Sequence, residues 1–128
     1  MEIRSVQPSQ IELVRQFLAA NGWAQRVDDP QRFKLLLANS QRTAVAIEAG
    51  QIVGFARALC DSVANGYISM VVVAPDFRRR GIGRALVQHL VGSDPHITWV
   101  LRAGRESAGF WATLGFANSA LAMERLRA

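Results

Sequence analysis

The pattern of apolar and polar residues in the N-terminal part of the chain predicts one strand followed by two helices. Polar and apolar residues alternate over Glu2–Val6, which predicts a strand that ends before Pro8. Ser9 and Glu12 have the spacing of a capping box, and apolar residues at helical spacing then predict a helix that stops at Asn21-Gly22. A second helix is predicted to begin at Asp28, Asp29 and Pro30. Its apolar residues are Phe33, Leu36 and Leu37.

The middle of the chain is rich in β-forming residues. Thr43–Glu48 and Ile52–Leu59 are separated by Ala49-Gly50-Gln51, which predicts an antiparallel hairpin. Tyr67–Val73 is predicted to be a further strand, and its last four residues are all apolar. A continuous apolar run is typical of a strand that is buried on both faces, so we expect this strand at the centre of a sheet.

The remaining pattern predicts a helix over Ile82–Val91, a strand over Ile97–Leu101, a short helix over Ser107–Leu114 and a closing strand over Leu121–Leu126. The order strand, loop, helix, strand implies a parallel pair of strands with a right-handed crossover. We therefore predict an α/β domain with a mixed sheet. The 128 residues contain no repeat or linker-like tract, so residues 1–128 are interpreted as a single domain.

Composition excludes several classes of protein. No apolar run reaches the length of a membrane span, and the N-terminus lacks the basic and apolar pattern of a signal peptide, so we expect a cytoplasmic protein. Cys60 is the single cysteine and is interpreted as a small buried residue. His89 and His96 are isolated, so no metal site is predicted.

Most of the chemical signal lies in one basic, glycine-containing loop. The net charge is +5, because fourteen arginines and Lys34 outnumber ten acidic residues. Four of the arginines lie at positions 78, 79, 80 and 84. Gly81 and Gly83 allow several backbone N–H groups to converge on one anion, and the N-terminus of the following helix adds further donors. This clustering favours a focused anion site, specifically one for pyrophosphate. It disfavours a nucleic-acid-binding surface, which we do not expect.

Two common phosphate-binding motifs do not fit this loop. A Rossmann site requires a third glycine where Leu86 stands, and a Walker A loop requires Gly-Lys followed by Ser or Thr, which is absent. The loop does match the signature of the GNAT N-acetyltransferase superfamily. Arg78-x-x-Gly81-x-Gly83 follows a strand that ends in Val73-Ala74-Pro75, and the chain resembles the family again over residues 110–116, Phe-Trp-Ala-Thr-Leu-Gly-Phe.

The resemblance implies a GNAT-like fold: a mixed, mostly antiparallel sheet with a splayed parallel pair of strands, flanked by about four helices. It further implies acetyl-CoA as the cofactor, with CoA as product, and transfer of the acetyl group to a primary amine of a small molecule or protein by direct attack. Because dimers are frequent among proteins of this type, the resemblance also allows a homodimer. The residues that it assigns to the cofactor are Val71, Val72, Val73, Arg78, Arg79, Arg80, Gly81, Ile82, Gly83, Arg84 and Trp111.

The catalytic groups are less well specified. The family commonly has a tyrosine that protonates the leaving thiolate, and Trp111 occupies its position here. Asp61, Tyr67 and Ser69 are the candidate catalytic residues, although each also has an ordinary role in a turn or strand. Arg105 and Glu106 are expected to cap or precede the last helix.

Two questions stay open at the level of sequence. The segment Asn21–Asp29, together with Trp23, Phe33 and Trp99, is the candidate region for acceptor recognition, although these aromatic residues are equally expected in the core. The alternative to an active enzyme is a catalytically silent acyl-CoA-binding regulatory protein, which the replacement by Trp111 keeps open.

Overall fold

The computed structural model describes residues 1–104 and 106–128, which form a five-stranded sheet with helices on both faces. In chain order the strands are β1 (Glu2–Arg4), β2 (Arg42–Glu48), β3 (Gln51–Cys60), β4 (Asn65–Val73) and β5 (Thr98–Leu101). The α-helices are α1 (Ile11–Leu18), α2 (Pro30–Ala38), α3 (Ile82–Val91) and α4 (Ala108–Thr113). Short 3-10 or π turns cover Pro8–Gln10, Ala19–Trp23, Ala24–Arg26 and Pro75–Phe77. In the described part of the chain, no helix is long and apolar enough to cross a bilayer.

The strands lie side by side in chain order, and only the last pair is parallel. Three antiparallel pairs join β1 to β4, and α3 connects β4 to the parallel strand β5. β5 pairs with residues 65–68 of β4, but β4 continues to Val73. The two parallel strands therefore separate halfway along β4. This confirms the predicted mixed, mostly antiparallel sheet with a splayed parallel pair.

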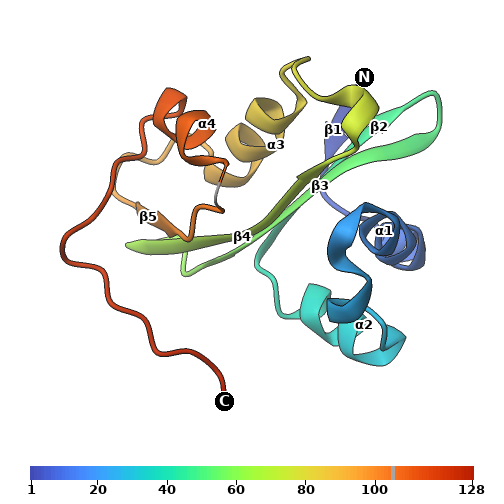
Figure 1. Ribbon diagram of the computed structural model, residues 1–128, viewed down its shortest axis with the longest axis horizontal. Helices are drawn as coiled ribbons and strands as arrows, with labels where there is room; N and C mark the ends of the chain where they lie inside the picture. The colour runs from blue at the N-terminus through green and yellow to red at the C-terminus, as the bar shows by residue number, and fades with distance from the viewer. Residues whose placement is uncertain (105) are drawn as a thin grey trace.

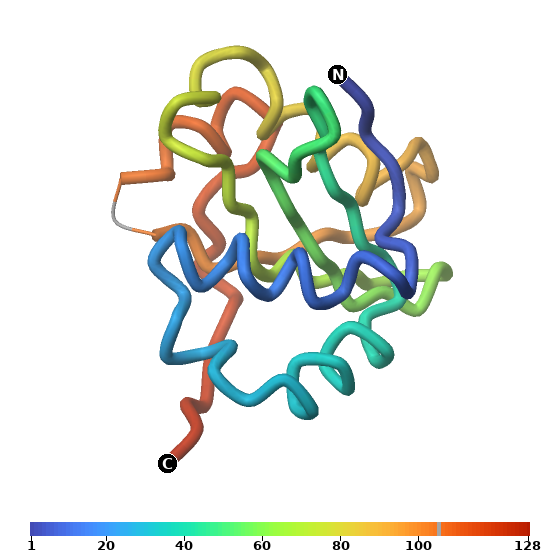
Figure 2. Tube along the Cα trace, turned by 90° about the vertical axis from the view of Figure 1, so that its right-hand side faces the viewer, coloured from blue at the N-terminus to red at the C-terminus, as the bar shows by residue number. Residues whose placement is uncertain are grey.

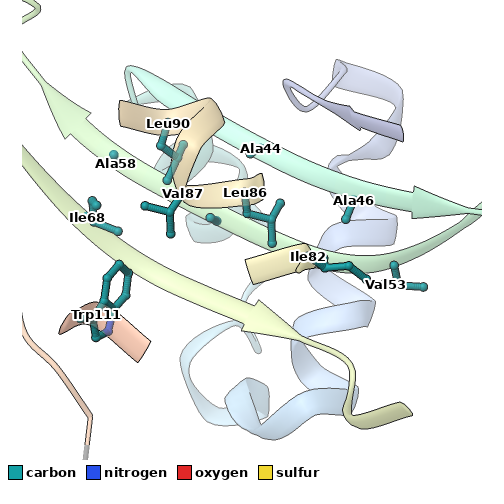
Figure 3. Close-up of a cluster of buried hydrophobic side chains, with 11 residues drawn as sticks. Ala44, Ala46, Val53, Ala58, Ile68, Ile82, Leu86, Val87, Leu90 and Trp111 are labelled. Atoms are coloured by element: carbon teal, nitrogen blue, oxygen red, sulfur yellow. The ribbon is translucent and has the colours of Figure 1, made fainter. Parts of the chain in front are cut away.

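The helices divide into two layers (Figure 1). α3 and α4 lie on one face of the sheet, and α1 and α2 cover part of the other, as the turned view also shows (Figure 2). The side chains of α3 pack onto small residues of the strands (Figure 3). Ala44, Ala46 and Ala58 have no or almost no exposed surface, and their short side chains let the helix approach the sheet closely.

Local sequence explains the best-predicted elements. α3 occupies the predicted residues, and its buried positions Ile82, Leu86, Val87 and Leu90 follow helical spacing. α2 begins where Asp29 accepts hydrogen bonds from the N–H groups of Gln31 and Arg32, at 3.0 and 3.2 Å. The β2–β3 hairpin turns at Ala49 and Gly50, which both have positive φ, as a tight two-residue turn requires.

A β-bulge interrupts the pairing of β3 and β4. Arg57 lies opposite Ser69 and Ala56 lies opposite Val71, so Met70 is an extra residue on β4. Met70 has φ of 60°, which is uncommon for a residue with a side chain. Met70 comes two residues after Ile68, the last residue of β4 that pairs with β5. It therefore marks the point where the two parallel strands separate.

Several predicted details at the N-terminus were wrong. β1 ends at Arg4, because the N–H of Val6 donates to the Thr43 hydroxyl at 3.0 Å instead of continuing a ladder. The capping box does not form between Ser9 and Glu12. The N–H of Gln7 donates to the Gln10 side chain at 2.8 Å, which begins the helical segment two residues earlier. Glu12 forms an ion pair with Arg15 instead.

The predicted closing strand over Leu121–Leu126 was also wrong. These residues have no strand pairing, and the side chains of Leu121 and Met123 are 92% and 98% exposed. The segment runs past β5, with Glu124 forming an ion pair with Arg102 at 2.9 Å. A pattern of apolar residues shows a tendency to form a strand, but a strand also needs a neighbour to satisfy its backbone groups.

Candidate active site

A groove of about 960 Å³ opens where β4 and β5 separate. One wall is the last three residues of β4, and a second wall is the loop and helix start over residues 77–79 and 81–84. α4 and the loop before it form the third wall, with Phe110 and Glu106. The segment after α1 closes one end with Asn21 and Trp23. The basic loop, α4 and the segment after α1 therefore surround the open edge of β4.

The edge of β4 presents unpaired backbone groups to this groove. The N–H of Ala74 donates to the carbonyl of Val53 in β3 at 2.9 Å. Because consecutive N–H groups of an extended strand point to opposite edges, the N–H groups of Val71 and Val73 point away from β3 and into the groove. The carbonyl of Val73 points the same way and accepts a hydrogen bond from Arg78 Nε at 3.2 Å.

Side chains of the same three valines differ in environment. Val72 is 7% exposed and belongs to the core under α1 and α2. Val71 and Val73 are half-buried on the other face. Met70 is half-buried as well, so the expectation that residues 70–73 are all buried at the sheet centre was wrong for every residue of the run except Val72. β4 is the fourth of five strands, and its second half has a neighbour on one side only.

The basic loop places a helix N-terminus at the floor of the groove. Gly81 has φ of 79° and precedes α3, without a side chain that could cap it. The first intrahelical bond runs from the N–H of Ala85 to the carbonyl of Gly81 at 3.1 Å. The N–H groups of Ile82, Gly83 and Arg84 have no partner within the helix. These three donors form an anion-binding arrangement.

The four loop arginines do not act together. Arg78, Arg79 and Arg84 line the groove, and Arg84 donates to the carbonyl of Thr113 at 3.3 Å. Arg80 instead forms an ion pair with Glu48 at 2.9 Å and stacks 5.1 Å from the centre of the Phe77 ring. It is not among the residues that line the groove. Arg80 therefore differs from the expectation that all four contact a cofactor.

Trp111 also lies elsewhere than expected. Its side chain is 8% exposed in the core, with edge-on contacts to Phe110 at 5.0 Å and Phe116 at 5.3 Å between ring centres. Figure 3 shows it pointing toward the sheet. Phe110 lines the groove in its place, beside Gly83. Sequence reasoning assigned Trp111 to the cofactor and missed Phe110. Adjacent residues of a helix point in different directions, so when one of this pair faces the core the other can face the groove.

Of the candidate catalytic residues, Asp61 has a clear structural role. Its Oδ1 accepts hydrogen bonds from the N–H groups of Val63, Ala64 and Asn65, at 2.8, 2.7 and 3.0 Å. These backbone donors lower the pKa of Asp61, which makes it a weaker base. The residue is exposed in the turn before β4, and it borders a different hollow from the groove.

Tyr67 and Ser69 lie on β4, on the N-terminal side of the bulge. Tyr67 borders the same separate hollow as Asp61 and lies between Leu59 and Val100. Ser69 is half-buried and lies next to Met70, where the strands separate. Neither residue lines the groove. Ser69 is the nearer in sequence to the open edge.

The segment Asn21–Asp29 is in part where the sequence predicted. Asn21 and Trp23 line the groove, and Arg26 stacks 5.5 Å from the centre of the Trp23 ring. Phe33 is buried in the core, 2% exposed. Trp99 packs against Gly66 on the face of the sheet that carries α3 and α4. Arg105 lies outside the described residues. Its neighbour Glu106 is the acidic residue among the described groove-lining residues.

A comparison with protein-family models matches residues 39–118 to the acetyltransferase (GNAT) domain. The match covers more than half of the chain and includes β2 to β5, the basic loop and α4. The chain belongs to this family. GNAT proteins use acetyl-CoA and act on small-molecule or protein acceptors. The family match confirms the resemblance that the basic loop and residues 110–116 predicted.

Solved structures share the fold of this chain. A protein assigned to the GNAT family from Xanthomonas campestris pv. campestris has a TM-score of 0.77 at 20% identity, covering 99% of this chain and 94% of that one. An acetyltransferase from Trypanosoma brucei has a TM-score of 0.75 at 22% identity, with 99% of both chains covered. AAC(6')-Iy in complex with the bisubstrate analog CoA-S-monomethyl-acetylneamine has a TM-score of 0.77 at 22% identity, covering 99% and 98%. A search of the curated proteins found no significant match.

Proposed function

We propose that this GNAT protein binds acetyl-CoA in the groove and transfers the acetyl group to a primary amine. The observation that carries the proposal is the juxtaposition of an unpaired strand edge with an uncapped helix N-terminus. The first offers alternating N–H and carbonyl groups, which suit the amides of a pantetheine arm. The second offers converging N–H groups and basic side chains, which suit a pyrophosphate.

The residues present fit this ligand. The N–H groups of Val71 and Val73 would pair with its amides, and Val72 would fix the strand through its buried side chain. The N–H groups of Ile82, Gly83 and Arg84 would bind the pyrophosphate, after the turn at Gly81. Arg78 and Arg79 would add positive charge at the rim. A Cβ at Gly83 would lie 3.2 Å from Phe110, so a larger side chain would compete for this space.

Acetyl-CoA supplies an activated acetyl group when bound. The protein must then hold a neutral amine and move its proton. Glu106 is the groove carboxylate and is our candidate to accept this proton, directly or through water. Ser69, beside the bulge, would relay the proton through water, because a neutral hydroxyl is not itself a base. Trp111 is buried and its indole is a poor acid, so thiolate protonation falls to water or to another group.

One observation favours the alternative of a catalytically silent acyl-CoA-binding regulator. The aromatic residue at the usual acid position is in the core and has no access to the groove. Such a protein would keep the cofactor groove and lack turnover. The two functions therefore share a binding site and differ in chemistry.

Binding and turnover are tested on the same sample. Calorimetric titration with CoA and acetyl-CoA measures binding, and thiol release across a panel of amines measures transfer. Binding with amine-dependent thiol release supports the enzyme, binding without release supports the regulator, and absence of binding overturns both.

Adjacent arginines provide a matched control for this binding site. We expect Arg79→Gln to weaken CoA binding about 10-fold, because a charge-assisted hydrogen bond contributes roughly 1.5 kcal/mol or more. Arg80→Gln removes the same charge one residue away, but its side chain is directed to Glu48. It should leave the dissociation constant within about 2-fold of wild type in buffer of physiological ionic strength. Equal losses in both variants would indicate general charge attraction instead of a defined site.

A further inference from the structure

One half-buried arginine has no explanation in the fold. Arg57 lies in β3, and its Nε is buried without a hydrogen-bond partner. Its Nη1 donates to the Ser40 hydroxyl at 3.1 Å. That hydroxyl donates in turn to the carbonyl of Leu36 at 2.8 Å, so it is a neutral acceptor for Arg57. Among the described residues, no carboxylate lies within ion-pair distance of Arg57.

An unpaired cation in this position is costly. Burial lowers the pKa of Arg57, and the nearby Tyr67 opposes this effect only in part. Other arginines of the chain show how such a charge is usually satisfied. Arg42 donates to the carbonyls of Leu90 and Val91 at the end of α3 and stacks on Trp99. Arg57 lacks an arrangement of this kind, which indicates that its partner arrives from outside the chain.

The position of Arg57 relates it to the groove. It lies directly opposite Ser69, so both side chains project from the same face of the sheet, the face that carries α1 and α2. Met70, the bulge residue, and Trp23 pack against the core cluster on this face. Trp23 also lines the groove. Arg57 therefore lies on β3, the neighbour of β4, level with the point where β4 and β5 separate.

In the proposed function the cofactor is held from the side of the basic loop and α3, so the acceptor approaches from the face of the sheet that carries α1 and α2. The basic loop and α3 hold one end of the groove on the opposite face, whereas Asn21 and Trp23 border the end toward α1. An amine that reaches the groove from that end passes the face occupied by Arg57, Ser69 and Tyr67. The planar guanidinium of Arg57, on the same face as the hydroxyl-bearing residues Ser69 and Tyr67, suits a planar group with a single negative charge, such as a carboxylate.

We propose that Arg57 binds a carboxylate of the acceptor, so that the substrate class is amines that carry a carboxylate, as amino acids do. This inference rests on the proposed acetyl transfer. A row of Leu59, Tyr67 and Val100 continues along the same face and offers apolar surface beside the carboxylate. A phosphate group would need more cationic partners than this face provides.

The test compares matched acceptors. Each of the twenty amino acids is assayed against its own carboxamide by acetyl-CoA-dependent thiol release, with wild type, Arg57→Met, Arg57→Lys and the control Arg32→Met. Arg32 is an exposed arginine of α2. We expect wild type to prefer the acid form in at least one pair. Arg57→Met should reduce that preference about 10- to 100-fold through a higher KM, with turnover of the amide unchanged. Arg57→Lys should be intermediate, and Arg32→Met should match wild type.

Two further measurements separate this inference from the proposed function. N-acetyl amino acids are titrated into the protein with and without CoA, which detects carboxylate binding even if no transfer occurs. Wild-type binding that Arg57→Met weakens about 10- to 100-fold supports the inference. Denaturant unfolding should show that Arg57→Met is as stable as wild type or more stable, because the substitution removes an unpaired buried charge.

Loss of CoA binding alone would overturn the proposed function and leave the carboxylate test in force. The inference about Arg57 is overturned if no pair shows a preference for the acid form and no N-acetyl amino acid binds. It is also overturned if Arg57→Met keeps the wild-type preference, or if its only effect is marked destabilisation.

Discussion

Enlarging Gly83 should separate cofactor binding from folding. A Cβ at this position would lie 3.2 Å from Cε1 and Cζ of Phe110 and 3.8 Å from Val73 Cγ2. The Phe110 contact is tighter than ordinary van der Waals contact, so the ring must move by a few tenths of an ångström. Phe110 is half-buried and lines the groove, which leaves it room to move. Replacing glycine by alanine within a helix gains up to about 1 kcal/mol, so Gly83→Ala should remain within about 1 kcal/mol of wild-type stability.

The effect on binding should grow with the size of the side chain. Gly83→Ala should weaken CoA binding only a few-fold, because it narrows the groove without filling it. The indole of Gly83→Trp would fill the space beside Val73 and Phe110. We expect it to reduce the affinity more than 100-fold, which corresponds to about 2.8 kcal/mol. Calorimetric titration with CoA measures the affinity, and urea unfolding monitored by circular dichroism measures the stability.

Gly109 provides the matched control. It also lies in a helix and has no neighbouring heavy atom within 4 Å of its would-be Cβ, but it does not line the groove. Gly109→Trp should therefore bind CoA as wild type does. If Gly83→Trp remains folded and binds CoA with wild-type affinity, the ligand does not lie against α3 and the proposed site is wrong.

Four further predictions concern stability and the candidate catalytic residue Asp61. A Cβ at Gly66 would overlap the Trp99 ring, so Gly66→Ala should destabilise by about 1–3 kcal/mol in urea unfolding, and an unchanged midpoint would show that the ring relocates freely. Trp111→Ala should lower the free energy of unfolding by about 3–5 kcal/mol, because it empties a buried site; a loss below about 1 kcal/mol would contradict its core placement. Asp61→Asn should retain acetyl transfer, since Asp61 lies outside the groove, and loss of activity in a folded variant would reinstate it as a base. Because its folded pKa is lowered, Asp61 contributes stability above its ordinary pKa, and this contribution is lost as pH falls through the folded value; acid unfolding of wild type and Asp61→Ala should therefore converge at the lowest pH.

Elements with strong local patterns were predicted well. α3 has the predicted bounds, and the β2–β3 hairpin turns at the predicted residues. The start of α2 follows from Asp29 and Pro30, which favour helix initiation whatever surrounds them. The basic loop stays a predicted anion site, which rests on glycine conformation and helix polarity, both properties of a few adjacent residues.

Errors arose where the outcome depends on a distant partner. Residues 121–126 have a strand-like pattern but no strand pairs with them. Arg80 resembles its neighbours in sequence, yet Glu48 on the β2–β3 hairpin draws it away from the groove. Trp111 and Phe110 are adjacent, and the packing of α4 against the sheet decided which of them faces the groove.

The sequence by itself determined the family and the mixed sheet, and it located the loop that is proposed to bind an anion. These depend on periodicity and on short motifs, whose physical preferences are carried by neighbouring residues. Only the tertiary structure decided that β4 and β5 separate after residue 68, that Phe110 faces the groove, and that the buried Nε of Arg57 lacks a hydrogen-bond partner. Burial, pairing and unsatisfied charge are relations between residues far apart in the chain, so they take definite values only once the chain has folded.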